Sequence, residues 1–221
     1  MTDHVPARSS NAPLLVAAIL AGASFWPVSW LSLPAPVMWV WKGAGVALLA
    51  LWAALAARER DGWLLACVLA FGALGDVLID AVGTTAGAAA FLVGHVLAII
   101  LYLANRGAQG GAVAVGIAIV TPVAAFALTR DVTALVYAIG LGGMAGAAWA
   151  SRFPRGWVGL GALLFVASDL LIFARVGPLN GSPLPRLLIW PLYFAGQAMI
   201  ATGVERTLDA RRRNEDLHHR L

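Results

Sequence analysis

The sequence predicts an all-α protein, a polytopic bundle of about eight transmembrane helices. Hydrophobic residues make up 61% of the 221 residues, charged residues only 12%, and the mean hydropathy is +0.83. A soluble domain has about 25% charged residues, so this chain is too apolar to be solvated. A helix needs about 20 apolar residues to cross a bilayer, and the apolar runs of this chain reach about that length. The single cysteine, Cys67, excludes a disulfide scaffold.

Proline, glycine and charged residues mark where each predicted span ends. The first four spans end before Pro34, Arg58, Gly83 and Asn105, which gives the ranges 13–31, 36–57, 63–81 and 87–104. The last four end before Thr129, Ser151, Pro178 and the polar residues after Arg206, which gives 111–128, 132–150, 157–177 and 186–206. We therefore expect a polar segment at 1–12, a transmembrane domain at 13–206 and a basic tail at 207–221, a solvated helix end or a frayed segment.

The distribution of arginine predicts the orientation. With a cytoplasmic N-terminus, eleven arginines fall in inside segments and three near outside loops. The inside arginines are Arg8, Arg58, Arg60, Arg106, Arg152, Arg155, Arg206, Arg211, Arg212, Arg213 and Arg220, and the outside ones Arg130, Arg175 and Arg186. Cytoplasmic loops retain positive charge, so both termini are expected in the cytoplasm, as an even number of spans requires. The net charge of +4 thus reflects topology and does not predict nucleic-acid binding.

Two features of the apolar segments have alternative interpretations. Residues 21–23, Ala-Gly-Ala, resemble a signal-peptidase site, but the apolar run continues through Trp30, and cleavage would leave an odd number of spans. Gly142 and Gly146 have the spacing that lets membrane helices approach closely. That spacing predicts close packing and no particular function.

Polar side chains inside the predicted spans are the candidates for function, because an ionisable residue at mid-bilayer costs at least about 2.5–3.5 kcal/mol. Five spans contribute such residues at a similar depth, toward the outer leaflet and the midplane. They are Lys42, Asp76, Asp80, His95, Asp169 and Gln197. An ion pair that only fixes helix packing is the alternative, and for His95 a packing role is as reasonable as a functional one. Together the residues predict one polar site.

The two aspartates Asp76 and Asp169 have similar surroundings, small-Asp-apolar-Leu-Ile, which hints at a four-plus-four repeat. Two carboxylates in a low-dielectric site are expected to share one proton, leaving one acid and one base. Such a pair can hydrolyse an acid-labile bond. Lys42 would tune the pair or hold an anionic group. The spans contain one cysteine and one histidine, so no metal site and no cofactor is expected.

Five ordered blocks, from about residue 37 to residue 204, resemble the YhhN-like lysoplasmalogenase family. They are Lys42, then Phe71-Gly-Ala-Leu-Gly-Asp76-Val-Leu, Phe91-Leu-Val-Gly-His95, Gly161-Ala-Leu-Leu-Phe-Val-Ala-Ser-Asp169 and Tyr193-Phe-Ala-Gly-Gln197. Two positions depart from the pattern: Gly43 stands where many relatives have proline after the lysine, and Ala98 where a tyrosine is expected three residues after the histidine. The nearest tyrosine is Tyr102.

The resemblance implies an eight-helix membrane hydrolase that cleaves the vinyl ether bond of lysoplasmalogens. Its products would be a fatty aldehyde and glycerophospho-ethanolamine or -choline. By resemblance, Asp76 and Asp169 are the catalytic pair, in unassigned roles. His95, Tyr193 and Gln197 would position water or the glycerol hydroxyl, Lys42 would approach the phosphate, and Asp80 would be a further substrate-binding or supporting residue. The expected partner is a lysophospholipid or another ether lipid with a single chain.

Three other functions fit membrane aspartates. A proton-coupled transporter uses such groups as proton relays, although matching helix breaks in two halves are absent from the sequence. An intramembrane aspartyl protease would need Gly-x-Gly-Asp, and position 73 is Ala73. A scaffold would use the aspartates for packing alone. Arginine, alanine and glycine are abundant, which is typical of a GC-rich bacterial genome and predicts the bacterial cytoplasmic membrane.

Overall fold

The computed structural model describes residues 11–108 and 110–218, and these form an all-helical bundle. Seven of the helices, one of them counted together with its opening π turn, are long and apolar enough to span a membrane, and the first, with 17 residues, is shorter. The protein is an integral multi-pass membrane protein. The elements are α1 (Ala12–Val28), α2 (Ala35–Ala56), α3 (Arg60–Ala81), α4 (Thr84–Ala104), α5 (Gly111–Thr129), α6 (Val132–Ala150), a π-helical turn η1 (Arg155–Gly159), α7 (Leu160–Arg175) and α8 (Leu184–His218).

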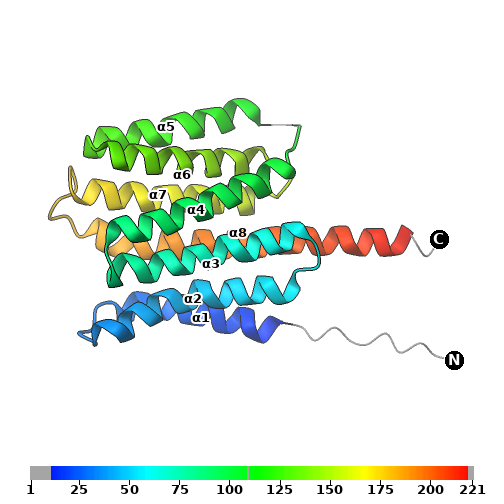
Figure 1. The fold of residues 1–221 in the computed structure, drawn as a ribbon, viewed down its shortest axis with the longest axis horizontal. Coiled ribbons are helices and arrows are strands. Elements are labelled where there is room, and N and C mark those ends of the chain that lie inside the picture. Colours follow the sequence, from blue (N-terminus) through cyan, green and yellow to red (C-terminus); the bar gives the residue numbers. More distant parts are fainter. Residues whose placement is uncertain (1–10, 109, 219–221) are drawn as a thin grey trace.

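The helices lie side by side along the long axis of the bundle (Figure 1). Helices α1 to α4 pack in sequence, each against the next, α5 packs against α6, and α7 packs against α8. Helix α8 also contacts α1, α2 and α3, so it joins the two halves of the chain. Helix α1 begins and α8 ends at the same end of the bundle (Figure 1), which follows from an even number of passes.

Most helix bounds lie within a few residues of the predicted ones, and the seventh and eighth spans have features that the sequence did not predict. The seventh span opens with the π turn η1, in which the backbone nitrogen of Leu160 donates to the carbonyl of Arg155, five residues back. Helix α8 continues without a break to His218. It stays helical beyond the predicted span because Leu208 is fully buried against the bundle and arginines further along make ion pairs.

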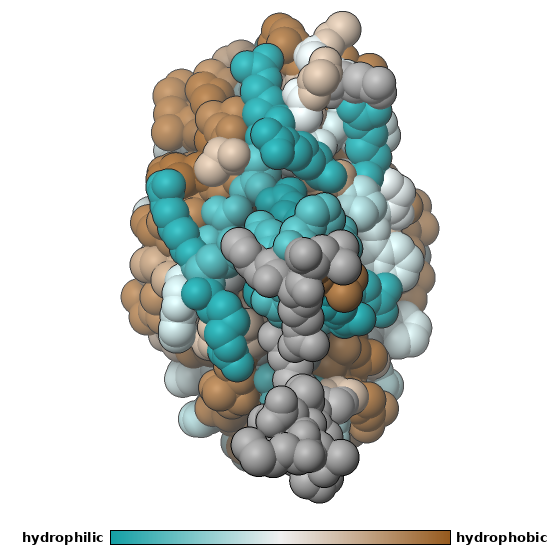
Figure 2. Space-filling model, turned by 90° about the vertical axis from the view of Figure 1, so that its right-hand side faces the viewer, coloured by the Kyte–Doolittle hydropathy of each residue, from teal (hydrophilic) through white to brown (hydrophobic). Residues whose placement is uncertain are grey.

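The end of the bundle where α8 stops is hydrophilic at its centre and hydrophobic at its rim (Figure 2). Nine of the arginines predicted to face the cytoplasm lie in the connections and helix ends on this side, and Arg130, Arg175 and Arg186 lie at the opposite end. Arg8 and Arg220 fall outside the described residues, as does most of the predicted segment 1–12. The charge asymmetry read from the sequence is therefore an asymmetry of the folded bundle.

Helices α5 and α6 pack closely along the glycines of the predicted small-residue motif. A Cβ atom on Gly146 would lie 2.5 Å from the carbonyl oxygen of Ala114, and one on Gly142 would lie 2.9 Å from the Cβ of Thr121. Real Cβ atoms do not approach this closely, so the two backbones can be neighbours only because these side chains are absent. The spacing thus serves close packing, as predicted.

We expect Gly146→Ala to destabilise the protein by about 1–3 kcal/mol, because the added methyl group meets a backbone oxygen that cannot turn away. Gly116→Ala on α5 is the matched control, since a Cβ there meets nothing within 4 Å. Thermal unfolding in detergent measures both. Equal stability of the two variants would show that α5 can shift away from α6 at no cost.

A network of ion pairs and hydrogen bonds connects the C-terminal part of α8 to the start of α3 and the end of α4. Arg212 Nη2 donates to Glu205 Oε1 at 2.8 Å and to Asp209 Oδ1 at 2.9 Å, and Arg212 Nη1 lies 3.8 Å from Glu59 Oε1 at the start of α3. Glu205 is buried, with 7% of its side chain exposed. Arg211 donates to the side-chain oxygen of Asn105 at the end of α4 at 2.7 Å.

Arg212→Met is expected to cost at least about 1–3 kcal/mol, because it leaves the buried carboxylate of Glu205 without its partner. Arg213→Met should change stability by less than about 0.5 kcal/mol, since the Arg213 side chain is 70% exposed and its ion pair with Asp209 lies at the surface. Denaturation in detergent compares the two. A smaller loss for Arg212→Met than for Arg213→Met would contradict the role of the buried pair.

Candidate active site

The carboxylate of Asp76 lies in the middle of the bundle and is held by a tyrosine from α8. Tyr193 donates its hydroxyl proton to Asp76 Oδ2 at 2.8 Å, and Gln197, one turn further along α8, donates from Nε2 to the Tyr193 oxygen at 3.3 Å. All three residues are buried, and Asp76 is 3% exposed. The result is a chain of donors, Gln197 to Tyr193 to Asp76, across α8 and α3.

Asp169 is held in the same manner by different helices. Tyr137 on α6 donates its hydroxyl proton to Asp169 Oδ2 on α7 at 2.6 Å, and Nε2 of His95 on α4 lies 3.2 Å from the Tyr137 oxygen. Because the one phenolic proton of Tyr137 points to Asp169, His95 Nε2 must be the donor in the second contact. This fixes the neutral imidazole as the tautomer protonated on Nε2. The second chain therefore reads His95 to Tyr137 to Asp169.

An aromatic cluster joins the two chains. The ring of Phe165 on α7 lies 5.3 Å from that of His95 and 5.1 Å from that of Tyr193, both edge to face. Phe91 on α4 lies 5.8 Å from Tyr193 and 6.0 Å from Phe165. Such edge-to-face pairs stabilise rings in fixed orientations. The hydroxyl groups that hold the aspartates are thus held by packing as well as by hydrogen bonds.

Asp76 has other charged side chains around it. Asp76 lies within electrostatic reach of Asp169, Lys42 and Asp80. Among the described residues, Oδ1 of Asp76 and Oδ1 of Asp169 have no hydrogen-bond partner. Each carboxyl group therefore has one oxygen engaged by a tyrosine and one oxygen left for a proton or a reacting group. A general acid or base needs such an oxygen to exchange a proton.

Lys42 and Asp80 form an ion pair beside this site. Lys42 Nζ on α2 donates to Asp80 Oδ2 on α3 at 2.9 Å, and the two side chains are 16% and 38% exposed. Asp80 lies one turn from Asp76 but faces a different partner. The ion pair is therefore more exposed than Asp76 and Asp169.

The small residues before each aspartate let neighbouring helices approach. A Cβ on Gly75 would lie 2.6 Å from the ring of Phe91, so only glycine fits between α3 and α4 at this point. Ser168 donates its hydroxyl to the carbonyl of Ile189 on α8 at 2.9 Å. Both small residues thus position the aspartate that follows them.

The structure brings together the residues that the sequence singled out, and adds one. Asp76, Tyr193 and Gln197 form one chain, His95 and Asp169 belong to the other, and Lys42 pairs with Asp80. Sequence reasoning missed Tyr137. Tyr102, the tyrosine nearest to the position where one was expected, packs against Phe153 at 6.1 Å and lies outside the site.

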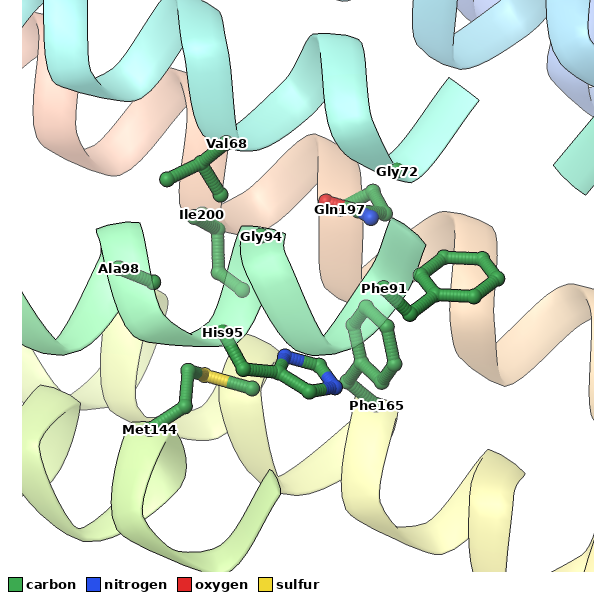
Figure 3. Close-up of a pocket in the computed structure, with 10 residues that line it drawn as sticks. All are labelled: Val68, Gly72, Phe91, Gly94, His95, Ala98, Met144, Phe165, Gln197 and Ile200. Atoms are coloured by element: carbon green, nitrogen blue, oxygen red, sulfur yellow. The ribbon is translucent and has the colours of Figure 1, made fainter. Parts of the chain in front are cut away.

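A small cavity lies where both chains of hydrogen bonds begin, at His95 and Gln197 (Figure 3). His95 from α4 and Gln197 from α8 supply its polar lining, and α3, α6 and α7 contribute apolar side chains or glycine. The space open to the centre of a water molecule is ≈ 20 Å³. Gly72 keeps room beside Gln197, since a Cβ there would lie 2.8 Å from Gln197 Nε2.

Comparison with known proteins gives one match. The family model of the YhhN family matches residues 37–204, which include every residue of the site. No curated protein and no solved structure matches the chain.

Proposed function

The chain belongs to the YhhN family, and we propose that it is a membrane-embedded hydrolase of lysoplasmalogens. It cleaves their vinyl ether bond, giving a fatty aldehyde and glycerophospho-ethanolamine or -choline. The observation that carries the proposal is the pair of buried aspartates, each held through one oxygen by a tyrosine hydroxyl and each with its second oxygen available.

Cleavage of a vinyl ether needs a proton donor and a water molecule. The acid transfers its proton to the β-carbon of R–O–CH=CH–R′, which leaves the cation R–O⁺=CH–CH₂–R′. Water adds to the cationic carbon and loses a proton to a base, and the hemiacetal collapses to R–OH and the aldehyde R′–CH₂–CHO. One protonated and one ionised aspartate supply the acid and the negative charge that stabilises the cation.

The surrounding residues fit a lipid with one chain. Lys42, in its partly exposed ion pair with Asp80, would bind the phosphate of the headgroup as a point charge. His95, Tyr193 and Gln197 would position water or the glycerol hydroxyl, and the alkenyl chain would lie among apolar helices. We further propose that the protein lies in a bacterial cytoplasmic membrane and that the arginine-rich end of Figure 2 faces the cytoplasm.

The decisive experiment measures aldehyde release from a synthetic lysoplasmalogen by the purified protein in detergent. We expect release by the wild type and none from the saturated alkyl ether analogue, which cannot form the cation. If the folded wild type releases no aldehyde, lysoplasmalogen is excluded as the substrate. Proton-driven solute flux into liposomes would in that case support the alternative, a transporter that uses the same aspartates.

Lys42→Met is expected to raise KM for the phospholipid substrate about tenfold with little change in kcat, because a remote ground-state contact is lost. A vinyl ether glycerol without phosphate is the matched substrate, and its kcat/KM should not change. An equal loss on both substrates would contradict a phosphate contact and would assign the ion pair to helix packing.

A further inference from the structure

The cavity lined by His95 and Gln197 has the size and polarity of a site for one water molecule. A single water needs about 10–15 Å³ of space open to its centre and at least two polar partners, and this cavity offers ≈ 20 Å³. Its polar side chains, His95 and Gln197, are 4% and 3% exposed. The apolar lining of the cavity includes Ala98, Met144 and Ile200 (Figure 3).

Both polar side chains have hydrogen-bonding capacity left for a ligand in the cavity. His95 uses Nε2 for Tyr137, so Nδ1 carries a free lone pair. Gln197 uses one amide hydrogen for Tyr193, which leaves its Oε1 and its second Nε2 hydrogen. Within residues 11–108 and 110–218, no side chain or backbone group pairs with these atoms. His95 Nδ1 and Gln197 Oε1 are both acceptors to which a water molecule in the cavity could donate.

Two chains of hydrogen bonds end at this cavity, and they differ in their ability to carry a proton. In the chain from His95 through Tyr137 to Asp169, every member can accept one proton and release another. In the chain from Gln197 through Tyr193 to Asp76, the amide cannot take up a proton. Of the two aspartates, and among the described residues, Asp169 alone is therefore connected to the cavity by groups that can carry a proton.

We propose that the cavity binds the water consumed in the reaction, and that His95 takes its proton and returns it through Tyr137 to Asp169. This inference rests on the proposed function and assigns Asp169 as the acid. Asp76, at the end of the chain that carries no proton, is the carboxylate that stabilises the cation.

The proton balance closes over one turnover. Asp169 gives its proton to the β-carbon and becomes a carboxylate. The water oxygen bonds to the cationic carbon while one water proton moves to His95 Nδ1. His95 passes its Nε2 proton to Tyr137, and Tyr137 passes its hydroxyl proton to Oδ2 of Asp169, which is again an acid. His95 is then protonated on Nδ1, so a change of its tautomer and a rotation of the Asp169 carboxyl group restore the resting state before the next turnover. Collapse of the hemiacetal moves the remaining hydroxyl proton to the leaving glycerol oxygen, so one water is consumed.

Water in the cavity is tested without any substrate. An X-ray pulse produces hydroxyl radicals from ordered water, and these oxidise the neighbouring sulfur of Met144. We expect oxidation of Met144 in the wild type, at least a fivefold decrease in Ala98→Val, which fills the cavity, and recovery in the double variant Ala98→Val/Ile200→Ala. No oxidation in the wild type, or equal oxidation in Ala98→Val, would overturn the water site whatever the substrate is.

The proton path is tested with His95→Gln. This substitution replaces the imidazole by an amide, the group that Gln197 supplies to Tyr193, and it keeps a hydrogen-bond donor for Tyr137. We expect kcat to fall about 100-fold, with KM and the unfolding temperature unchanged. In D₂O the recovered substrate should contain deuterium at the vinyl β-carbon, because protonation becomes reversible when water adds slowly. A lower kcat without deuterium in the substrate, or an unchanged kcat, would overturn the path, whereas a wild type without aldehyde release would overturn the proposed function instead.

Discussion

Asp76→Asn and Asp169→Asn are each expected to lower kcat for aldehyde release by about 10²–10⁴-fold, the usual contribution of a general acid or base. Asparagine has the shape of aspartate and can still accept the hydrogen bond of Tyr193 or Tyr137 at its carbonyl oxygen. It cannot carry the transferred proton or a negative charge. The variants therefore separate the chemistry of the carboxyl group from its place in the fold.

The control for these variants is Asp131→Asn. Asp131 begins α6 at the surface and accepts a hydrogen bond from the backbone nitrogen of Thr133 at 2.7 Å. Asparagine caps a helix as well as aspartate does, so stability and activity should stay as in the wild type. Full activity of either buried variant would exclude the acid–base pair, and loss of folding would leave Asp→Glu at the same position to decide between packing and chemistry.

Most of the fold was predictable because the bilayer imposes a simple rule on the sequence. Every span must be apolar over about 20 residues, so Pro34, Arg58 and Asn105 mark ends that the structure confirms within a few residues. This rule did not predict where α8 ends. Beyond Arg206 the helix is held by ion pairs and the buried Leu208, and such contacts depend on neighbours that apolar periodicity does not reveal.

Residues of the candidate site were predictable where placing their side chains in the bilayer has a high free-energy cost. Charged or amide side chains in a span need an explanation, and this led to Lys42, Asp76, His95, Asp169 and Gln197. Tyr137 carries no such signal, because a tyrosine near a span end is an ordinary interfacial residue. Its role follows from the packing of α6 against α7, which places its hydroxyl on Asp169.

A sequence signal for the two chains exists, but the structure is needed to read it. Phe91-Leu-Val-Gly-His95 and Tyr193-Phe-Ala-Gly-Gln197 share an aromatic residue, a glycine and a final polar residue at the same spacing. In the structure the polar residue of each block contacts a tyrosine that holds one aspartate. The blocks differ in histidine against glutamine, and we attribute the different roles of the two aspartates to that difference.

This difference predicts unequal effects of the same substitution on the two tyrosines. Tyr137→Phe is expected to lower kcat about 100-fold, because it removes the hydroxyl that carries the proton between His95 and Asp169. It also leaves the Nε2 hydrogen of His95 without its acceptor, which costs about 1–3 kcal/mol of stability. Tyr193→Phe should lower kcat by about tenfold only, since Tyr193 orients Asp76 and transfers nothing.

Deuterium incorporation in D₂O distinguishes the roles of Tyr137 and Tyr193 more clearly than the change in kcat does. For Tyr137→Phe the recovered substrate should carry deuterium at the vinyl β-carbon, as for His95→Gln, and the double variant should be no slower than the slower single variant, because both changes interrupt one path. For Tyr193→Phe the substrate should stay free of deuterium, since water still adds quickly to each cation. Deuterium in the substrate of Tyr193→Phe alone would reverse the assignment and make Asp76 the acid.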